Sequence, residues 1–143
     1  MSARRKARKR ALDVLFEADL RGIDAAELLS LRTADAAPPV APYARLLVEG
    51  VLAHQAEIDA LISEHALGWT LPRLPGVDRV LLRLAIYEVL YCPDVPRAVA
   101  IDEAVELAKS LSTEESPSFL NGVLGAVARA APIEAPTGER SEL

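Results

Sequence analysis

The sequence is poor in the residues that build disulfides, cysteine-based metal sites and β-sandwich cores. Cys92 is the one cysteine among 143 residues, so no internal disulfide can form, and this usage fits a reducing cytoplasm. Only 4% of the residues are aromatic and seven are glycine, whereas 51% are hydrophobic. We therefore expect a core of leucine, valine, isoleucine and alanine, which favours an all-α fold of packed helices.

Long uncharged runs are also missing. No uncharged stretch approaches the ~18 residues that a membrane-spanning helix needs. Asp13, Glu17 and Asp19 interrupt any apolar segment that could serve as a secretory signal. The length predicts one domain, which we place at residues 1–131, followed by a disordered acidic tail at 132–143.

No pattern in the sequence indicates catalysis. There is neither a phosphate-binding glycine loop nor a serine elbow. We expect His54 and His65 on one face of a single long helix, about 16 Å apart at 1.5 Å per residue, too far to share a metal ion. Cys92 has no histidine nearby in sequence. We therefore predict a protein that is not an enzyme and that uses no metal or cofactor.

Positive charge is concentrated at the N-terminus. Six of the first ten residues are basic, namely Arg4, Arg5, Lys6, Arg8, Lys9 and Arg10. The rest of the chain holds ten basic and 21 acidic residues, a net charge of −11. Such a local positive field is typical of nucleic-acid binding, and a loose solvated tail is the alternative. Six phosphate contacts to single-stranded RNA would give a log–log salt slope of about −4.

The basic segment continues directly into a helical pattern. Apolar residues recur at three- and four-residue steps from Ala7 to Ala18, which predicts that the segment is the start of the first helix. Arg4 lies one turn from Arg8, and Arg5 one turn from Lys9, so we expect two short cationic rows.

The remaining apolar spacing brings the prediction to six or seven helices without a strand. Gly22 ends the first helix, and a short second helix covers residues 24–31. A proline-rich linker at 34–42 precedes one long helix over 42–65, where Gly50 would let another helix approach closely.

Three more helices follow. The most buried one begins near Val77, and the next spans residues 99–111 with Leu111 facing inward. A Ser116-Pro117 pair caps the last helix, which ends near residue 130. Asn121-Gly122 alone would suggest a turn, but the helical period continues across it, so we expect Gly122 and Gly125 to mark a close helix contact.

Phe119 opens the last helix beside acidic and hydroxyl side chains. An aromatic ring there could stack on a nucleobase, while the free N–H groups of the helix meet a phosphate. The alternative is that Phe119 belongs to the hydrophobic core.

Several segments in combination resemble the NusB family of bacterial transcription antitermination factors. They are RRKAR at 4–8, VDR at 77–79, LAIYE at 84–88, DVP at 94–96, VAIDEAVELAK at 99–109 and SPSFLNGVL at 116–124. The resemblance covers roughly residues 4–130. The sequence departs from the family at Asp102, where asparagine is usual, and at Glu115, where aspartate is common.

The resemblance implies a bundle of two three-helix halves and a role in transcription. Members of the family bind the boxA RNA of ribosomal RNA transcripts together with the ribosomal protein NusE. The complex joins RNA polymerase and other elongation factors and suppresses termination in the cytoplasm. Whether this chain also forms a homodimer is left open.

Carried over residue by residue, the resemblance also implies the binding surfaces. RNA would contact Arg4, Arg5, Lys6, Arg8, Lys9, Phe16, Glu115, Ser118 and Phe119, and NusE would contact the surface around Asp78 and Arg79. Two alternatives remain. One is a helical scaffold that binds proteins without recognising RNA. The other is the RNA-binding part of ribosomal RNA cytosine methyltransferases, which also need a long catalytic domain that 143 residues do not include.

Overall fold

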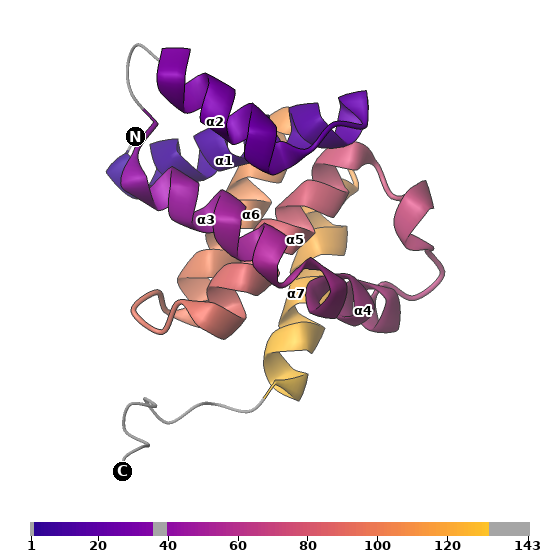
Figure 1. Ribbon diagram of the computed structural model, residues 1–143. Helices are drawn as coiled ribbons and strands as arrows, with labels where there is room; N and C mark the ends of the chain where they lie inside the picture. Colours follow the sequence, from indigo (N-terminus) through magenta and orange to yellow (C-terminus); the bar gives the residue numbers. More distant parts are fainter. Residues whose placement is uncertain (1, 36–39, 132–143) are drawn as a thin grey trace.

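The computed structural model describes residues 2–35 and 40–131, which form seven α-helices and one short 3-10 helix (Figure 1). In chain order these are α1 (Ala3–Arg21), α2 (Ala25–Asp35), α3 (Pro42–Ala53), α4 (Gln55–His65), η1 (Leu71–Arg73), α5 (Gly76–Tyr91), α6 (Arg97–Leu111) and α7 (Ser116–Ala130). No strand occurs in the described ranges, so the all-α prediction is confirmed. The predicted tail at 132–143 lies outside them.

α5 is the helix around which the two halves pack. Helices α1, α2 and α3 contact one another, and α5, α6 and α7 form the second group, with α4 against α5 and α7. α5 also contacts α1 and α3, so it joins the halves (Figure 1). Nine of its 16 residues are buried, which confirms the prediction that this helix is the most buried.

The ends of α1 explain why the basic segment is helical. The Ser2 hydroxyl accepts a hydrogen bond from the Arg5 backbone N–H at 3.1 Å and so caps the first turn. Gly22 ends the helix with φ of 66°, a left-handed conformation that favours glycine. The predicted apolar face is buried, from Ala7 through Ala18.

The single helix predicted for residues 42–65 is wrong, because the chain breaks at His54 into α3 and α4. The His54 N–H bonds to the carbonyls of both Gly50 and Val51, and its ring stacks on Tyr91 at 4.0 Å between centroids. The close approach expected at Gly50 is confirmed, since an added Cβ would lie 2.1 Å from Cζ of Tyr87 on α5. The rings of α5 therefore pack directly on α3 where the chain turns.

Four smaller predictions also need correction. Helix α2 continues to Asp35, beyond the predicted start of the linker, and Leu111 is 38% exposed. An added Cβ at Gly122 would meet nothing within 4 Å, and at Gly125 only Arg129 of the same helix, so neither glycine marks a helix contact. Glu115, not Ser116, precedes α7 as its cap residue. The helical interpretation of Asn121-Gly122 is confirmed.

None of the helices in residues 2–35 and 40–131 is both long and apolar enough to cross a membrane.

Candidate nucleic-acid interface

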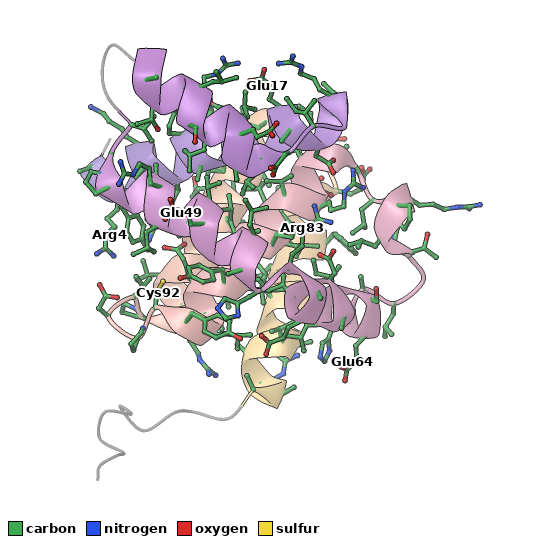
Figure 2. The ribbon with its side chains drawn as sticks, viewed as in Figure 1. Arg4, Glu17, Glu49, Glu64, Arg83 and Cys92 are labelled. Carbon is green, nitrogen blue, oxygen red and sulfur yellow. The ribbon has the colours of Figure 1, made fainter. Side chains whose placement is uncertain are left out.

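Three of the six basic residues at the start of α1 form surface ion pairs. Arg5 donates from Nε and Nη2 to the two carboxylate oxygens of Glu103 on α6, at 2.8 and 2.9 Å. Arg4 lies at the edge of the molecule, where it donates to Asp94 at 3.1 Å in the turn after α5 (Figure 2). Lys9 donates to Asp13, one turn along α1. Much of the positive charge at the N-terminus is thus already matched by carboxylates.

Arg8 is not a surface residue. It is 6% exposed, and its Nε donates to both carboxylate oxygens of Glu88 on α5 at 2.9 and 3.0 Å. The Tyr43 hydroxyl of α3 also donates to Glu88, and burial, followed by Glu88, raises the pKa of Tyr43. The expected row of Arg4 and Arg8 is therefore wrong, because Arg8 points inward and ties three helices together.

Lys6 and Arg10 form a different cationic row. They lie one turn apart on α1, and neither forms an ion pair with any residue that the structure describes. Arg10 was not among the expected RNA contacts, although its spacing from Lys6 was visible in the sequence. These two side chains are the part of the basic segment most available to an anion.

Phe16 connects α1 to the start of α5. Its ring packs against Gly76, where an added Cβ would lie 2.8 Å from Cε1 of Phe16. Arg5, Lys9 and Phe16 follow one another at spacings of four and seven residues, so they share one face of α1. That face leads from the cations to the loop before α5.

The same loop contributes to the wall of an apolar pocket of about 460 Å³. We call it the aromatic pocket, and it is lined by Trp69, Leu74, Pro75, Asp78, Thr113, Glu115, Ser116 and Phe119. The Phe119 ring packs partly on the main core and stands 6.1 Å from the Trp69 ring at an angle of 59°. Phe119 is thus both a core residue and a pocket wall, and Glu115 and Ser118 are exposed beside it.

Asp78 and Arg79 hold the walls of the aromatic pocket in place. Asp78 is 3% exposed and accepts hydrogen bonds from Ser112 at 2.6 Å and Ser116 at 2.8 Å, which fixes the corner between α6 and α7. Its carboxylate therefore faces the interior, whereas the prediction placed Asp78 on the surface that meets a protein partner. Arg79 donates to the carbonyls of Leu71 and Leu74 and to Asp19, and so fixes the loop before α5.

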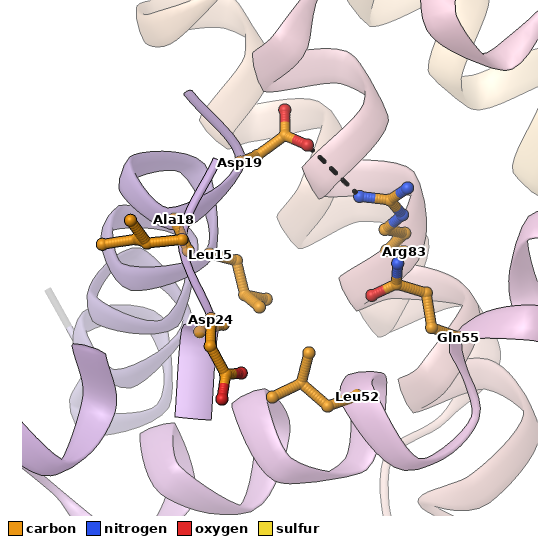
Figure 3. Close-up of a pocket in the computed structure, with 9 residues that line it drawn as sticks. Leu15, Ala18, Asp19, Asp24, Leu52, Gln55 and Arg83 are labelled. Carbon is orange, nitrogen blue, oxygen red and sulfur yellow. Dashed lines mark ion pairs between the residues drawn. The ribbon is translucent and has the colours of Figure 1, made fainter. Parts of the chain in front are cut away.

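A second hollow, of about 230 Å³, involves none of the expected site residues (Figure 3). It is lined by Leu15, Ala18, Asp19, Ile23, Asp24, Ala25, Leu52, Gln55 and Arg83. Arg83 approaches Asp19 to 3.8 Å and donates to Asp59 at 2.8 Å. Arg83 thus pairs with acids of α1 and α4, so the charged groups of this hollow join helices and are not available to a ligand.

The remaining candidates for chemistry do not come together. His54 precedes the first residue of α4, and His65 is its last residue, so the two rings lie at opposite ends of that helix. Within the described residues, no group of three or more His, Cys, Asp or Glu side chains could hold a metal ion. Burial raises the pKa of the Cys92 thiol to about 11, so it is protonated at neutral pH.

Residues 5–129 match the model of the NusB family. The transcription antitermination protein NusB of Acidothermus cellulolyticus is 63% identical over 127 residues, covering 89% of this chain and 88% of that protein. The protein of the same name from Saccharopolyspora erythraea is 62% identical over 130 residues, covering 90% of this chain and 88% of its own length.

Solved structures agree with this match. The NusB structure of T. maritima has a TM-score of 0.81 and 36% identity, covering 91% of this chain and 93% of that one. A crystal structure of antitermination factors NusB and NusE in complex with dsRNA contains a chain with a TM-score of 0.75 and 32% identity, covering 92% of this chain and 100% of that one.

Proposed function

The chain belongs to the NusB family, and from this premise we propose that it is a transcription antitermination factor. It binds the boxA RNA of ribosomal RNA transcripts together with the ribosomal protein NusE. As a non-catalytic adapter in the cytoplasm, it connects that RNA to the elongating RNA polymerase and its other factors. A relative that was crystallised with NusE and dsRNA supports the proposal.

The observation that carries the RNA-binding role is a succession of residues that leads from the cations of α1 to the aromatic pocket. Exposed Lys6 and the neighbouring cations of α1 begin the path, Phe16 extends it to Gly76, and Pro75 beside Gly76 lines the aromatic pocket. From Arg5 to Phe16 the path is about 16 Å long at 1.5 Å per residue. This length suits a few nucleotides of extended single strand.

The two ends of the path supply different parts of recognition. The cations contact phosphates, which positions the RNA without reading its sequence. The rings of Phe119 and Trp69 offer stacking surfaces for an unpaired base, and exposed Glu115 can accept a hydrogen bond from an exocyclic amino group. We therefore assign RNA contacts to Arg4, Arg5, Lys6, Lys9, Arg10, Phe16, Glu115, Ser118 and Phe119, and we assign Arg8 to the interior.

The NusE surface has to be carried by neighbours of Asp78 that reach solvent. In the loop before α5, Leu67 is 83% and Trp69 is 47% exposed. Residues 66–75 contain no acidic side chain, so this loop offers an apolar contact rather than a negatively charged one. We propose that Leu67 of this loop, which lies outside the aromatic pocket and is the more exposed of the two, is part of the contact with NusE.

The RNA path is tested with charge-neutralising variants. We expect the double variant Lys6→Gln/Arg10→Gln to weaken binding of a boxA-type RNA about tenfold or more at low salt and to make the log–log salt slope shallower by about 1.4. Arg129→Gln, which removes one exposed charge at the end of α7, is the control for loss of a cation outside α1 and should change affinity less than about twofold. Equal effects of both changes would favour the scaffold alternative.

A further inference from the structure

Glu103 pairs with Arg5, one of the cations on the proposed RNA path. It extends from α6 to α1, its side chain is 17% exposed, and both of its oxygens accept hydrogen bonds from Arg5. Arg8 adds a second positive charge, with its Nη1 3.9 Å from Glu103 Oε1. A carboxylate of the protein thus occupies the donor edge of an arginine on the proposed RNA path.

We propose that Glu103 is a built-in competitor of RNA, which holds Arg5 in the free protein and releases it only when an RNA phosphate takes the place of the carboxylate. This inference rests on the proposed RNA-binding function and describes how that same site is regulated.

The geometry of the pair supports competition for the same atoms. Arg5 uses Nε and Nη2 for Glu103, and this fork is the edge with which an arginine binds a phosphate through two parallel bonds. The hydrogen bonds from Arg5 lower the pKa of Glu103, so the carboxylate is ionised at neutral pH. A phosphate that approaches Arg5 therefore meets a negative charge already in position.

The surrounding residues keep the competitor in place. Arg8 and Glu88 form a buried pair under Arg5, so α1 stays attached to α5 when the surface pair opens. Arg4 and Asp94 form a similar but more exposed pair, with side chains 46 and 67% exposed, so solvent screening makes Asp94 a weaker competitor. Lys6 and Arg10 remain available for the first contact with RNA.

This arrangement favours RNA over weaker anions. Glu103 is tethered beside Arg5 and has a high local concentration, so a single anion displaces it poorly. An RNA strand that is already held by Lys6, Arg10 and the aromatic pocket presents its phosphate to Arg5 at a similarly high local concentration. Arg5 therefore joins the contact after the strand is in place.

The test compares two neighbouring acids on α6. Glu103→Gln keeps an oxygen for Arg5 but removes the charge, while Asp102→Asn removes an equal charge from an exposed residue that forms no hydrogen bond or ion pair with α1 among the described residues. We expect Glu103→Gln to tighten binding of a boxA-type single-stranded RNA about three- to tenfold at ~50 mM salt, as removal of one nearby like charge predicts, and less at high salt. Asp102→Asn should change affinity less than about twofold. Equal gains, no gain or a loss with Glu103→Gln would overturn the proposal.

A second pair of variants separates competition for Arg5 from general repulsion. In an Arg5→Gln background, Glu103→Gln should give little further gain, because no arginine remains to be released. A gain of undiminished size would overturn the proposal, because Glu103 would then simply repel RNA.

The failure of this inference can be told from failure of the proposed function. If the wild-type protein shows no preference for boxA RNA, the proposed function fails.

The Arg5 Nε–H resonance in NMR reports the Arg5–Glu103 pair directly. It should shift in Glu103→Gln without RNA and again when RNA binds the wild-type protein. RNA binding that leaves this resonance unchanged would overturn the role of Glu103 alone.

Discussion

Replacing Glu88 with leucine should destabilise the fold more than any surface change. The Arg8 and Glu88 side chains are 7 and 2% exposed, and Glu88 also accepts a hydrogen bond from Tyr43. Glu88→Leu would leave the Arg8 charge buried without a partner, which costs about 3–5 kcal/mol. For a protein of this size the midpoint of thermal unfolding should fall by about 10 °C or more.

The matched control is the double variant Arg8→Met/Glu88→Leu. It replaces the pair by apolar side chains, which is often neutral or stabilising by about 1–4 kcal/mol relative to an ion pair. Its unfolding midpoint in urea or on heating should therefore recover most of the loss seen in Glu88→Leu. A loss below about 1 kcal/mol for Glu88→Leu, or a double variant no more stable than the single one, would refute the buried ion pair as the link between α1 and α5.

Three other contacts can be perturbed in the same way. Gly50→Ala should lower the free energy of unfolding by about 1–3 kcal/mol, because the new Cβ would lie 2.1 Å from Tyr87. Gly122→Ala should raise it by about 0.5–1 kcal/mol, because a Cβ there meets nothing within 4 Å and alanine favours the helix. Denaturant titration measures both changes. Arg79→Gln should release the loop before α5, because it removes the hydrogen bonds to the carbonyls of Leu71 and Leu74, and should weaken RNA binding several-fold. A red shift in the fluorescence of Trp69, the one tryptophan, would report the release of the loop. An unchanged emission spectrum would contradict the role of Arg79 in holding the loop. Burial, and next the hydrogen bond to Glu57, raises the pKa of Tyr91 to about 12. The contribution of Tyr91 to stability should therefore be complete below about pH 10 and be lost as the pH rises towards 12. Ultraviolet titration of Tyr91→Phe against the wild type would identify the titrating group.

The helices were largely readable from the sequence, and the main exception is the break at His54, which coincides with a tertiary contact. Apolar spacing and capping residues gave the ends of α1 and α7 within one or two residues. The break at His54 was hidden, because the apolar period continues through Ile58 and Ile62 of α4, and neither glycine nor proline marks the turn. Packing of Tyr87 and Tyr91 accompanies the break, and a contact of that kind leaves no trace in local periodicity.

The site was readable in composition but not in pairing. Arg8 stands in line with Leu12 and Leu15, at spacings of four and seven residues, so its inward position could have been inferred. Its partner Glu88 lies 80 residues away, and nothing in one sequence indicates which buried acid meets which buried base. The same holds for Arg5 and Glu103, since a carboxylate on a polar helix face looks the same whether it meets solvent or an arginine.

Specific RNA recognition is tested most directly by titrating the wild-type protein with a boxA-type single-stranded RNA and with a scrambled RNA, with and without NusE, across a salt series. We predict that boxA binds at least about tenfold more tightly, that NusE widens the difference, and that the five outward-facing cations give a log–log salt slope of about −3.5. Equal, weak binding of both RNAs that NusE does not change would contradict the account.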